Sequence, residues 1–517
     1  MAFTLFGGGK PDHPMMDLNH VRKLISGLPA NDSVKALNDV TAWLDSINSA
    51  EGFRLDRRFE LIDLLDQTAR NHVRIVSEEY QSTQRLQKFK ENALWTAAFE
   101  FWKLLGDAYG RCVEQLWSDA SAAREIRTEL PVIVARALRA LTLQMKWMLL
   151  RYSPVDVRVW GEVGRHYFFA ENKEIATETI EIYPGAHGQG TVQQEFLKAM
   201  MFGVSANHGL NPVQQEIAAR AVAHFGKMFA LQLQPGPGCS FYFDLSLREP
   251  PAHVSQGFTP NPTARCFGAG GVLAALNALI QEIRQLDRVP AELDLGVNFD
   301  TDLVLSALRH LVLHWSDEPP ARRWERRRIA MRLTVVHGFQ NLLRAIETLA
   351  DDTSLDFEHA AATESWVIED LGEGGFGAVI PPIMGDWIKG GILLGVQTED
   401  WRAWGAGIIR RIVRDESRQR RVGIEILAQE AIPVKLSPAG AVSQAGAMRA
   451  GESALLLSAM PDKQGEISLL VRAGSSMRDR TIEMNVRGKR YQLLPGSLIE
   501  GGDDYALVTF EATELIG

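Results

Sequence analysis

The chain has 517 residues, of which 46% are hydrophobic and 23% are charged. This composition is ordinary for a globular protein and excludes a mainly disordered chain, and the length predicts several domains. The net charge of −9 argues against general DNA or RNA binding by the whole chain. The cysteines, Cys112, Cys239 and Cys266, are far apart and odd in number, so we expect reduced thiols in a cytoplasmic protein.

Residues 1–14 lack a basic segment followed by a long apolar core, so we expect a flexible tail and no signal peptide. Residues 15–205 are predicted to form a helical domain. Apolar residues recur there at steps of three and four, as on one helix face: Phe59, Ile62, Leu65, Ala69, Val73, Val76 and Tyr80. Residues 93–105 are apolar on two sides, which predicts a helix in the middle of a bundle.

The most apolar segment, residues 131–150, carries Arg136, Arg139 and Lys146. Three charges in so short a stretch favour a buried amphipathic helix over a membrane span, and no transmembrane segment is predicted. Ser153 and Pro154 then resemble the cap and first position of another helix.

Residues 206–320 are predicted to be a mixed α/β segment, with two strands in residues 229–247 joined at residues 235–238. Residues 266–271, CFGAGG, open an apolar helix, but no strand is expected directly before them, so we interpret them as a turn and not a phosphate site. His310 and His314 lie four apart without a third ligand nearby, so we expect core or interface histidines and no metal site.

The stretch ESWVIEDLGEGGFGAV, residues 364–379, predicts a strand that runs into a glycine-rich turn. Residues 371–379 match the phosphate loop of protein kinases. A kinase also requires a strand lysine, an H-R-D loop and a D-F-G motif, and none follows in a suitable context. The kinase interpretation is therefore rejected.

A second resemblance of the same stretch is supported by motifs elsewhere in the sequence. Residues 370–375 are similar to the D/N-x-S-x-x-G turn of PilZ domains, small β-barrels that bind the bacterial messenger cyclic di-GMP. Arg328 and Arg332 have the spacing of the family's R-x-x-x-R pair and precede a predicted strand at residues 333–336. Residues 404–413 and 420–427 resemble the closing strands of the same barrel. The resemblance covers about residues 321–430.

The chain departs from the family pattern at two places. Gly372 stands where the pattern has serine, and residues 339–363 separate the first strand from the turn. Part of that separation, FQNLLRAIETL, predicts an inserted helix. The expected fold is therefore a multidomain α+β protein: a helical N-terminal half, a mixed middle segment, a PilZ-like six-stranded antiparallel β-barrel with an inserted helix, and a β-rich C-terminal module at residues 431–517.

The resemblance implies a bacterial cyclic di-GMP receptor that needs no cofactor and signals to a protein partner through its helical half. Arginine suits this ligand because its planar fork pairs with phosphate and with guanine, and an aspartate can accept from the guanine edge. The implied ligand-binding residues are Arg327, Arg328, Arg332, Asp370, Gly372 and Gly375. Two alternatives remain open: residues 322–332 contain other R-x-x-x-R pairs, and the barrel could be a degenerate scaffold that binds no nucleotide. An enzyme is not expected, because no catalytic triad, metal set or acid–base pair is found.

Residues 431–517 contain further short strand patterns divided by glycine, proline and aspartate. They predict either a second small β-domain or an extension that completes the first barrel.

Overall fold

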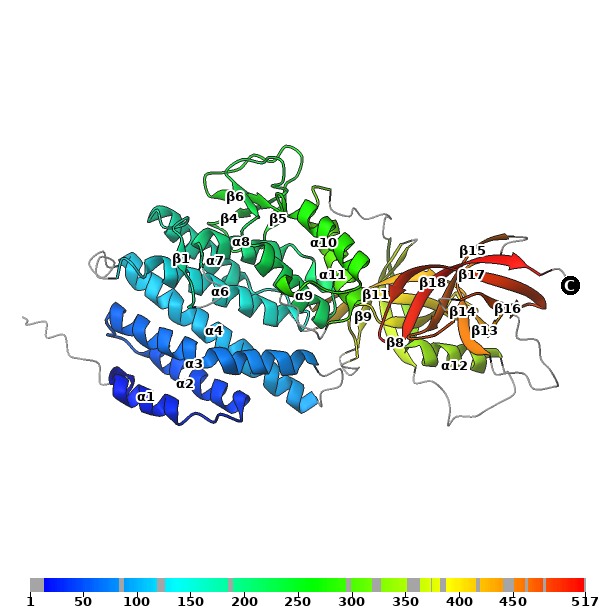
Figure 1. Cartoon of the computed structure of the whole chain (residues 1–517), viewed down its shortest axis with the longest axis horizontal. Helices are drawn as coiled ribbons and strands as arrows, with labels where there is room; N and C mark the ends of the chain where they lie inside the picture. The colour runs from blue at the N-terminus through cyan, green and yellow to red at the C-terminus, as the bar shows by residue number, and fades with distance from the viewer. Residues whose placement is uncertain are drawn as a thin grey trace, which may run out of the picture. The chain divides into compact units, whose positions relative to one another are not determined.

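Helices dominate the first part of the chain and strands dominate the last part, which confirms the predicted α+β class (Figure 1). The computed structural model describes residues 14–82, 88–118, 126–184, 189–293, 299–318, 327–350, 363–372, 374–381, 387–414, 419–439, 451–460, 464–477 and 480–515. The chain divides into two compact units: Met1–Asn207 with Pro212–Pro320, and His208–Asn211 with Ala321–Gly517.

The first unit is a helical bundle that also contains a small sheet. Its helices in the described ranges are α1 (Leu18–Ser26), α2 (Ser33–Ser49), α3 (Leu55–Ser82), α4 (Lys88–Ser118), α6 (Leu130–Leu149), α7 (Val157–Asn172), α8 (Val192–Gly203), α9 (Pro212–Phe225), α10 (Val272–Leu286) and α11 (Thr301–Trp315). The predicted apolar face in residues 59–80 lies on α3 and is mostly buried. Helix α4 packs against α2, α3 and α6, which confirms a helix in the middle of the bundle.

The apolar segment with three charges is the buried helix α6. Arg136 pairs with Asp63, and Lys146 pairs with Glu216, so the buried charges are compensated within the bundle. No helix in the described ranges combines the length and the apolar character that a membrane crossing requires.

Three local predictions need correction or refinement. Helix α7 begins at Val157 and not at Ser153, because the Asp156 carboxylate accepts from the Arg158 N–H and caps the helix there. The strands β3 (Ala230–Gln232) and β4 (Phe241–Asp244) do form, but β6 (Ala264–Gly268) lies between them. Strand β6 also directly precedes α10, contrary to prediction.

The glycines after β6 are explained by a close backbone approach. A Cβ atom at Gly268 would lie 2.4 Å from the Gly238 carbonyl oxygen, and the Gly270 N–H donates to the same oxygen at 3.2 Å. On α11, the His310 ring contacts the backbone of the first unit, because its Nε2 lies 2.9 Å from the Ser205 carbonyl oxygen.

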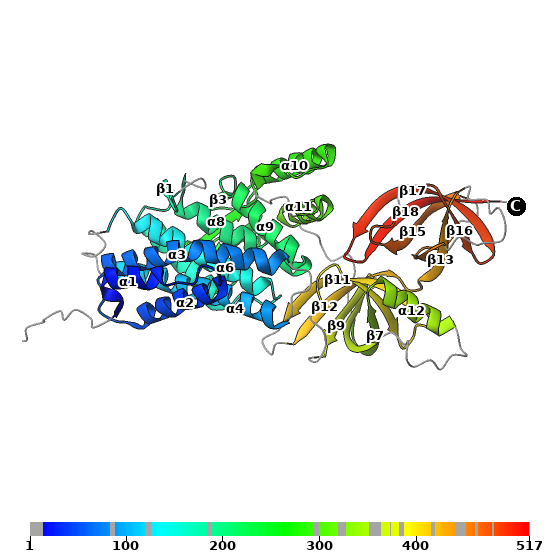
Figure 2. The same cartoon turned by 60° about the horizontal axis from the view of Figure 1, so that its bottom comes forward.

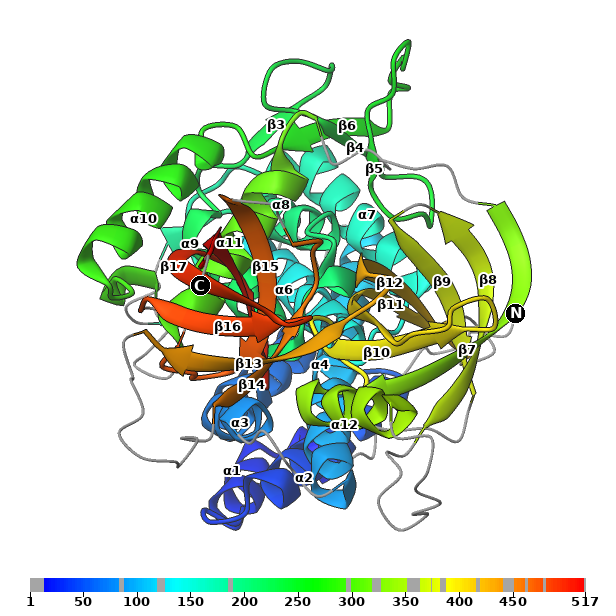
Figure 3. The ribbon, with the colours of Figure 1, turned by 90° about the vertical axis from the view of Figure 1, so that its right-hand side faces the viewer.

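The second unit contains two closed barrels of six antiparallel strands each (Figure 2). The first barrel consists of β7 (Arg327–His337), β8 (Glu364–Gly372), β9 (Gly375–Ile380), β10 (Leu393–Thr398), β11 (Gly405–Arg414) and β12 (Arg420–Ala428), in the order β10-β11-β12-β9-β8-β7. Helix α12 (Phe339–Ala350) follows β7 and packs against β7 and β10 (Figure 3). The predicted barrel with an inserted helix is therefore confirmed.

The C-terminal module closes on itself and does not complete the first barrel. Its strands are β13 (Ile432–Pro438), β14 (Glu452–Leu456), β15 (Gln464–Arg472), β16 (Ile482–Val486), β17 (Lys489–Gly501) and β18 (Tyr505–Glu514). It encloses its own apolar core, in which Leu436, Leu469, Ile482 and Phe510 are fully buried.

A polar and apolar seam joins the two barrels. The Arg410 guanidinium on β11 donates to both carboxylate oxygens of Glu500 on β17, at 2.6 and 2.7 Å, and to Glu425 on β12 at 2.6 Å. The Tyr505 hydroxyl donates to the Gly391 carbonyl oxygen at 3.1 Å. Beneath these contacts, side chains of both barrels and of α12 form one buried cluster.

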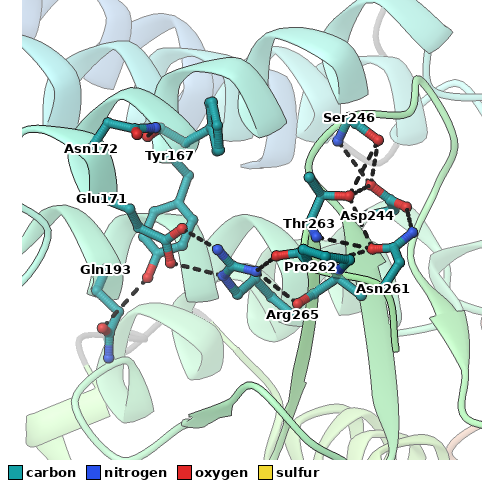
Figure 4. A network of polar contacts seen from close by, with 12 residues as sticks. Tyr167, Glu171, Asn172, Gln193, Asp244, Ser246, Asn261, Pro262, Thr263 and Arg265 are labelled. Atoms are coloured by element: carbon teal, nitrogen blue, oxygen red, sulfur yellow. Dashed lines mark hydrogen bonds and ion pairs between the residues drawn. The ribbon is translucent and has the colours of Figure 1, made fainter. Parts of the chain in front are cut away.

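In the first unit, Asp244 at the end of β4 accepts several hydrogen bonds (Figure 4). Its donors are the Ser246 N–H at 2.9 Å and the hydroxyls of Ser246 and Thr263, each at 2.7 Å, together with the Asn261 amide. Burial raises the pKa of Asp244, but the donors from Asn261, Ser246 and Thr263 outweigh burial and lower the pKa to about 2. Nearby, Arg265 on β6 pairs with Glu171 on α7.

The depressed pKa of Asp244 predicts a pH-dependent stability. A carboxylate whose folded pKa lies below its unfolded pKa stabilises the fold above the unfolded value, and the effect disappears as the pH falls through the folded value. The carboxylate should therefore contribute about 2 kcal/mol above pH ~4, lost toward pH ~2, at ~1.4 kcal/mol per pKa unit. Denaturation of wild type and Asp244→Asn, followed by helical circular dichroism, should show a stability gap that shrinks in this window. A gap that is constant from pH 6 to pH 2.5 would contradict this account, and the exposed Asp45→Asn serves as the control.

Candidate functional site

Strand β7 carries the three arginines that the resemblance implies. Leu333 and Val335 are buried inside the barrel, so Arg332, which alternates with them, lies on the outer surface. A β-bulge lies between Arg328 and Met331. Arg327 lines the mouth of the barrel, so the adjacent Arg328 points to the outside.

The glycine-rich turn joins β8 to β9, and the end of β8 that leads into it lies beside Arg327 and Arg328. Arg328 is the cross-strand partner of Asp370, and Asp370 is in turn the partner of Gly377 on β9. A Cβ atom at Gly377 would lie 2.5–2.6 Å from the atoms of the Asp370 carboxyl group. Glycine at this position therefore leaves room for the Asp370 side chain to lie over the β9 backbone.

The same cross-strand row continues over the next two strands. Gly377 pairs with Gly423 on β12, and Gly423 pairs with Arg411 on β11. The neighbours of both glycines, Phe376 and Val422 among them, are buried inside the barrel, so both glycines face outward. We refer to Gly377 and Gly423 as the glycine floor: Gly377 is buried beneath the Asp370 carboxyl group, and Gly423 is partly exposed.

Glycine is required at position 375 for a different reason, which is the close approach of a neighbouring backbone. Gly375 begins β9 and pairs with Gly372 across the turn. A Cβ atom there would lie 1.9 Å from the Ile424 carbonyl oxygen on β12. Gly375 therefore permits a close backbone approach that holds the turn against β12.

The mouth of the first barrel contains a cavity of about 650 Å³. Apolar side chains line most of it, together with the polar residues Arg327, Thr398, Asp400 and Gln429. Elsewhere in the barrel Trp366 is fully buried and its ring stacks with that of Trp387, 6.0 Å away, while His337 stacks on Trp387 at 4.2 Å.

The structure separates the six residues that the resemblance implies. Arg328, Arg332 and Asp370 lie on the outer surface of β7 and β8, and Gly375 supports the adjoining turn. Arg327 and Gly372 instead line the cavity in the mouth.

The sequence interpretation did not single out Gly377 and Gly423, which follow Asp370 in the same cross-strand row. A signal was present in the chain: each glycine alternates with buried apolar residues of its strand, as expected of an outward position that lacks a side chain.

The two glycines of β9 should respond differently to the addition of one methyl group. In Gly375→Ala the methyl group meets a backbone oxygen that cannot move away, so we expect a loss of roughly 1–3 kcal/mol of stability. In Gly377→Ala it meets the Asp370 side chain, which can rotate, so the loss should be smaller. Urea denaturation followed by β-sheet circular dichroism measures both. Equal losses in the two variants would refute this account of the turn.

Two family models match the chain. One, described as cyclic-di-GMP receptor FimW, N-terminal domain, matches residues 19–236. The other, described as cyclic-di-GMP receptor FimW, middle PilZ domain, matches residues 347–433. No curated protein matches the chain.

The second match includes Asp370, Gly377, Arg411 and Gly423, whereas the arginines of β7 precede it. The two matches lie in the order of the helical unit and the first barrel, and together they cover more than half of the residues. The chain therefore belongs to the FimW family of cyclic-di-GMP receptors, which contains a PilZ domain.

Proposed function

We propose that this chain binds cyclic di-GMP on the outer surface of the first barrel, at Arg328, Arg332 and Asp370. The family membership supports the choice of ligand, because both matched descriptions are of a cyclic-di-GMP receptor. The observation that carries the proposal is the cross-strand pairing of Arg328 with Asp370 and of Asp370 with Gly377.

The chemistry of this surface suits a guanine-containing dinucleotide. Arg328 and Arg332 are exposed and supply guanidinium donors for phosphate oxygens or for guanine O6 and N7. Asp370 supplies acceptors for the N1–H and amino group of a guanine. The adjoining Gly377 leaves room for the Asp370 carboxyl group against the β9 backbone.

We assign Arg327 and Gly372 a lesser role than the resemblance implies. Both line the cavity in the mouth, and the neighbouring Arg328 is the arginine on the outer surface. The hydroxyl of the family's usual serine is also missing at Gly372.

We further propose that the protein acts as a receptor in the cytoplasm and not as an enzyme, with the helical unit contacting a protein partner. The three cysteines are free and buried, in keeping with a reducing compartment. Trp117 on α4 is 52% exposed and stacks with the exposed Phe168 on α7, and exposed aromatic pairs of this kind favour protein contacts. A degenerate scaffold that binds no nucleotide is the alternative.

Titration calorimetry of the full chain with cyclic di-GMP tests the proposal. Arg328→Ala and Arg332→Ala should each weaken binding about tenfold to a hundredfold, since a charge-assisted hydrogen bond contributes roughly 1.5–3 kcal/mol. Asp370→Ala should weaken binding by a similar factor and also reduce the preference for cyclic di-GMP over cyclic di-AMP, because only guanine offers its N1–H to the carboxylate. Arg327→Ala should have a smaller effect.

The matched control is Arg490→Ala, an exposed arginine on β17 of the second barrel. It should bind as wild type does. If wild type shows no binding up to near-millimolar cyclic di-GMP, the receptor proposal is wrong and the scaffold alternative replaces it.

A further inference from the structure

We propose that Val367 and Val379 form an apolar platform on which one guanine of the ligand lies, beside the carboxylate of Asp370. This inference rests on the proposed function. It adds a non-polar contact that neither the arginines nor the glycine-rich turn supplies.

Val367 is an apolar side chain that the fold leaves in water. It lies on β8 between Trp366 and Ile368, which are both fully buried inside the barrel, so its side chain points outward and is 50% exposed. Among the residues that the structure describes, it is the one large apolar side chain on the six strands of the first barrel that is exposed. Single exposed apolar residues are common on protein surfaces, so the argument for a role depends on its neighbours.

The strand register surrounds Val367 with residues of the candidate site. Its cross-strand partners are Arg332 on β7 and Val379 on β9. Val379 alternates with the buried Ala378 and Ile380, so it also faces outward, and it is half-buried. Directly opposed side chains have Cβ atoms about 5 Å apart, so the two valines adjoin each other and Arg332 flanks them.

The valines and Asp370 lie on the same wall of the barrel. Val367 and Asp370 are both on β8, and their partners on β9, Val379 and Gly377, are two residues apart. Two residues span about 7 Å along a strand, so the valines form the next outward row beside the Asp370 carboxylate. A two-ring base whose edge meets that carboxylate can therefore extend over the valines.

An ion pair bounds the platform on the side of β12. The register of β8 shifts between Ile368 and Asp370, and the extra residue is Glu369. The Glu369 carboxylate pairs with the Arg421 guanidinium on β12, 3.5 Å away. Because β9 lies between β8 and β12, the platform occupies the outer surface between this ion pair and Arg332.

A guanine gains from an apolar surface as well as from polar contacts. Its edge forms hydrogen bonds, whereas its flat faces pack against apolar or aromatic side chains. Valine suits this role because its branched side chain has few rotamers to lose when a base covers it. Covering an exposed apolar side chain also removes it from water, which favours binding.

The test is a calorimetric titration of the full chain with cyclic di-GMP. Val367→Thr should weaken binding about threefold to tenfold, because a hydroxyl replaces one methyl group under the base. The melting temperature should not change, since threonine is also β-branched and suits a strand. Val367→Ile keeps a branched apolar side chain, so it should bind at least as tightly as wild type.

The salt dependence separates this contact from those of the arginines. The loss of affinity in Val367→Thr should be equal at low and at high salt, whereas the loss in Arg332→Ala should shrink as salt is added. The matched control is Ile499→Thr on β17 of the second barrel, because Ile499 is also β-branched and is 53% exposed. It should bind as wild type does.

The possible failures can be distinguished. If wild type binds cyclic di-GMP and Arg332→Ala loses affinity, but Val367→Thr binds as wild type does, then the platform is overturned and the proposed function stands. The platform is also overturned if Ile499→Thr loses as much affinity as Val367→Thr, or if Val367→Thr lowers the melting temperature together with the affinity. If wild type binds nothing, both the platform and the proposed function are wrong.

Discussion

The pairing of β7 with β8 is the constraint on which the candidate site depends. It places Arg328 opposite Asp370, although the two residues are far apart in the sequence and the helix α12 is inserted between their strands. A slip of one residue would turn Arg328 toward the interior and bring a neighbouring side chain to the surface, because side chains alternate between the two faces of a strand. Leu333, Val335, Trp366 and Ile368 are buried on the inner side and oppose such a slip.

The division of the outer surface follows from how the two barrels pack. Apolar residues of β10 and β11, including Leu393, Ala406 and Ile408, lie in the cluster shared with α12 and the second barrel. The glycine floor lies on β9 and β12 instead. Arg410 occupies the boundary between the two regions, since it pairs with Glu425 of the first barrel and with Glu500 of the second.

Much of the first barrel could be predicted from the sequence because its signals are local. The spacing of Arg328 and Arg332, the strand that follows them and the glycine-rich turn are all short motifs, and the inserted helix has its own periodicity. The outward position of Arg411 could not be predicted in this way, since it depends on the register of β11 against β12 and on a bulge that no local pattern specifies. The inward turn of Arg327 likewise depends on where the bulge in β7 falls.

The sequence predictions that were wrong in the first unit also failed because local patterns do not specify which contacts the folded chain uses. Ser153 and Pro154 have the residue types of a helix start, but the Asp156 carboxylate provides the cap that the structure uses. The strand β6 is short and fully buried, and it contains arginine, cysteine and glycine, so its sequence carries no alternation that would reveal it. The glycines after it look like a phosphate loop, yet their tight packing against Gly238 is sufficient to explain them.

The most direct test of the account is a crystal structure of the full chain with bound cyclic di-GMP. We predict that the ligand lies on the outer surface of β7 and β8, with one guanine edge within hydrogen-bond distance of the Asp370 carboxylate and with the guanidinium groups of Arg328 and Arg332 in contact with its phosphate oxygens or its guanines. Ligand density inside the mouth of the barrel, against Arg327, Asp400 and Trp401, or on any surface away from β7, β8 and β9 would contradict it.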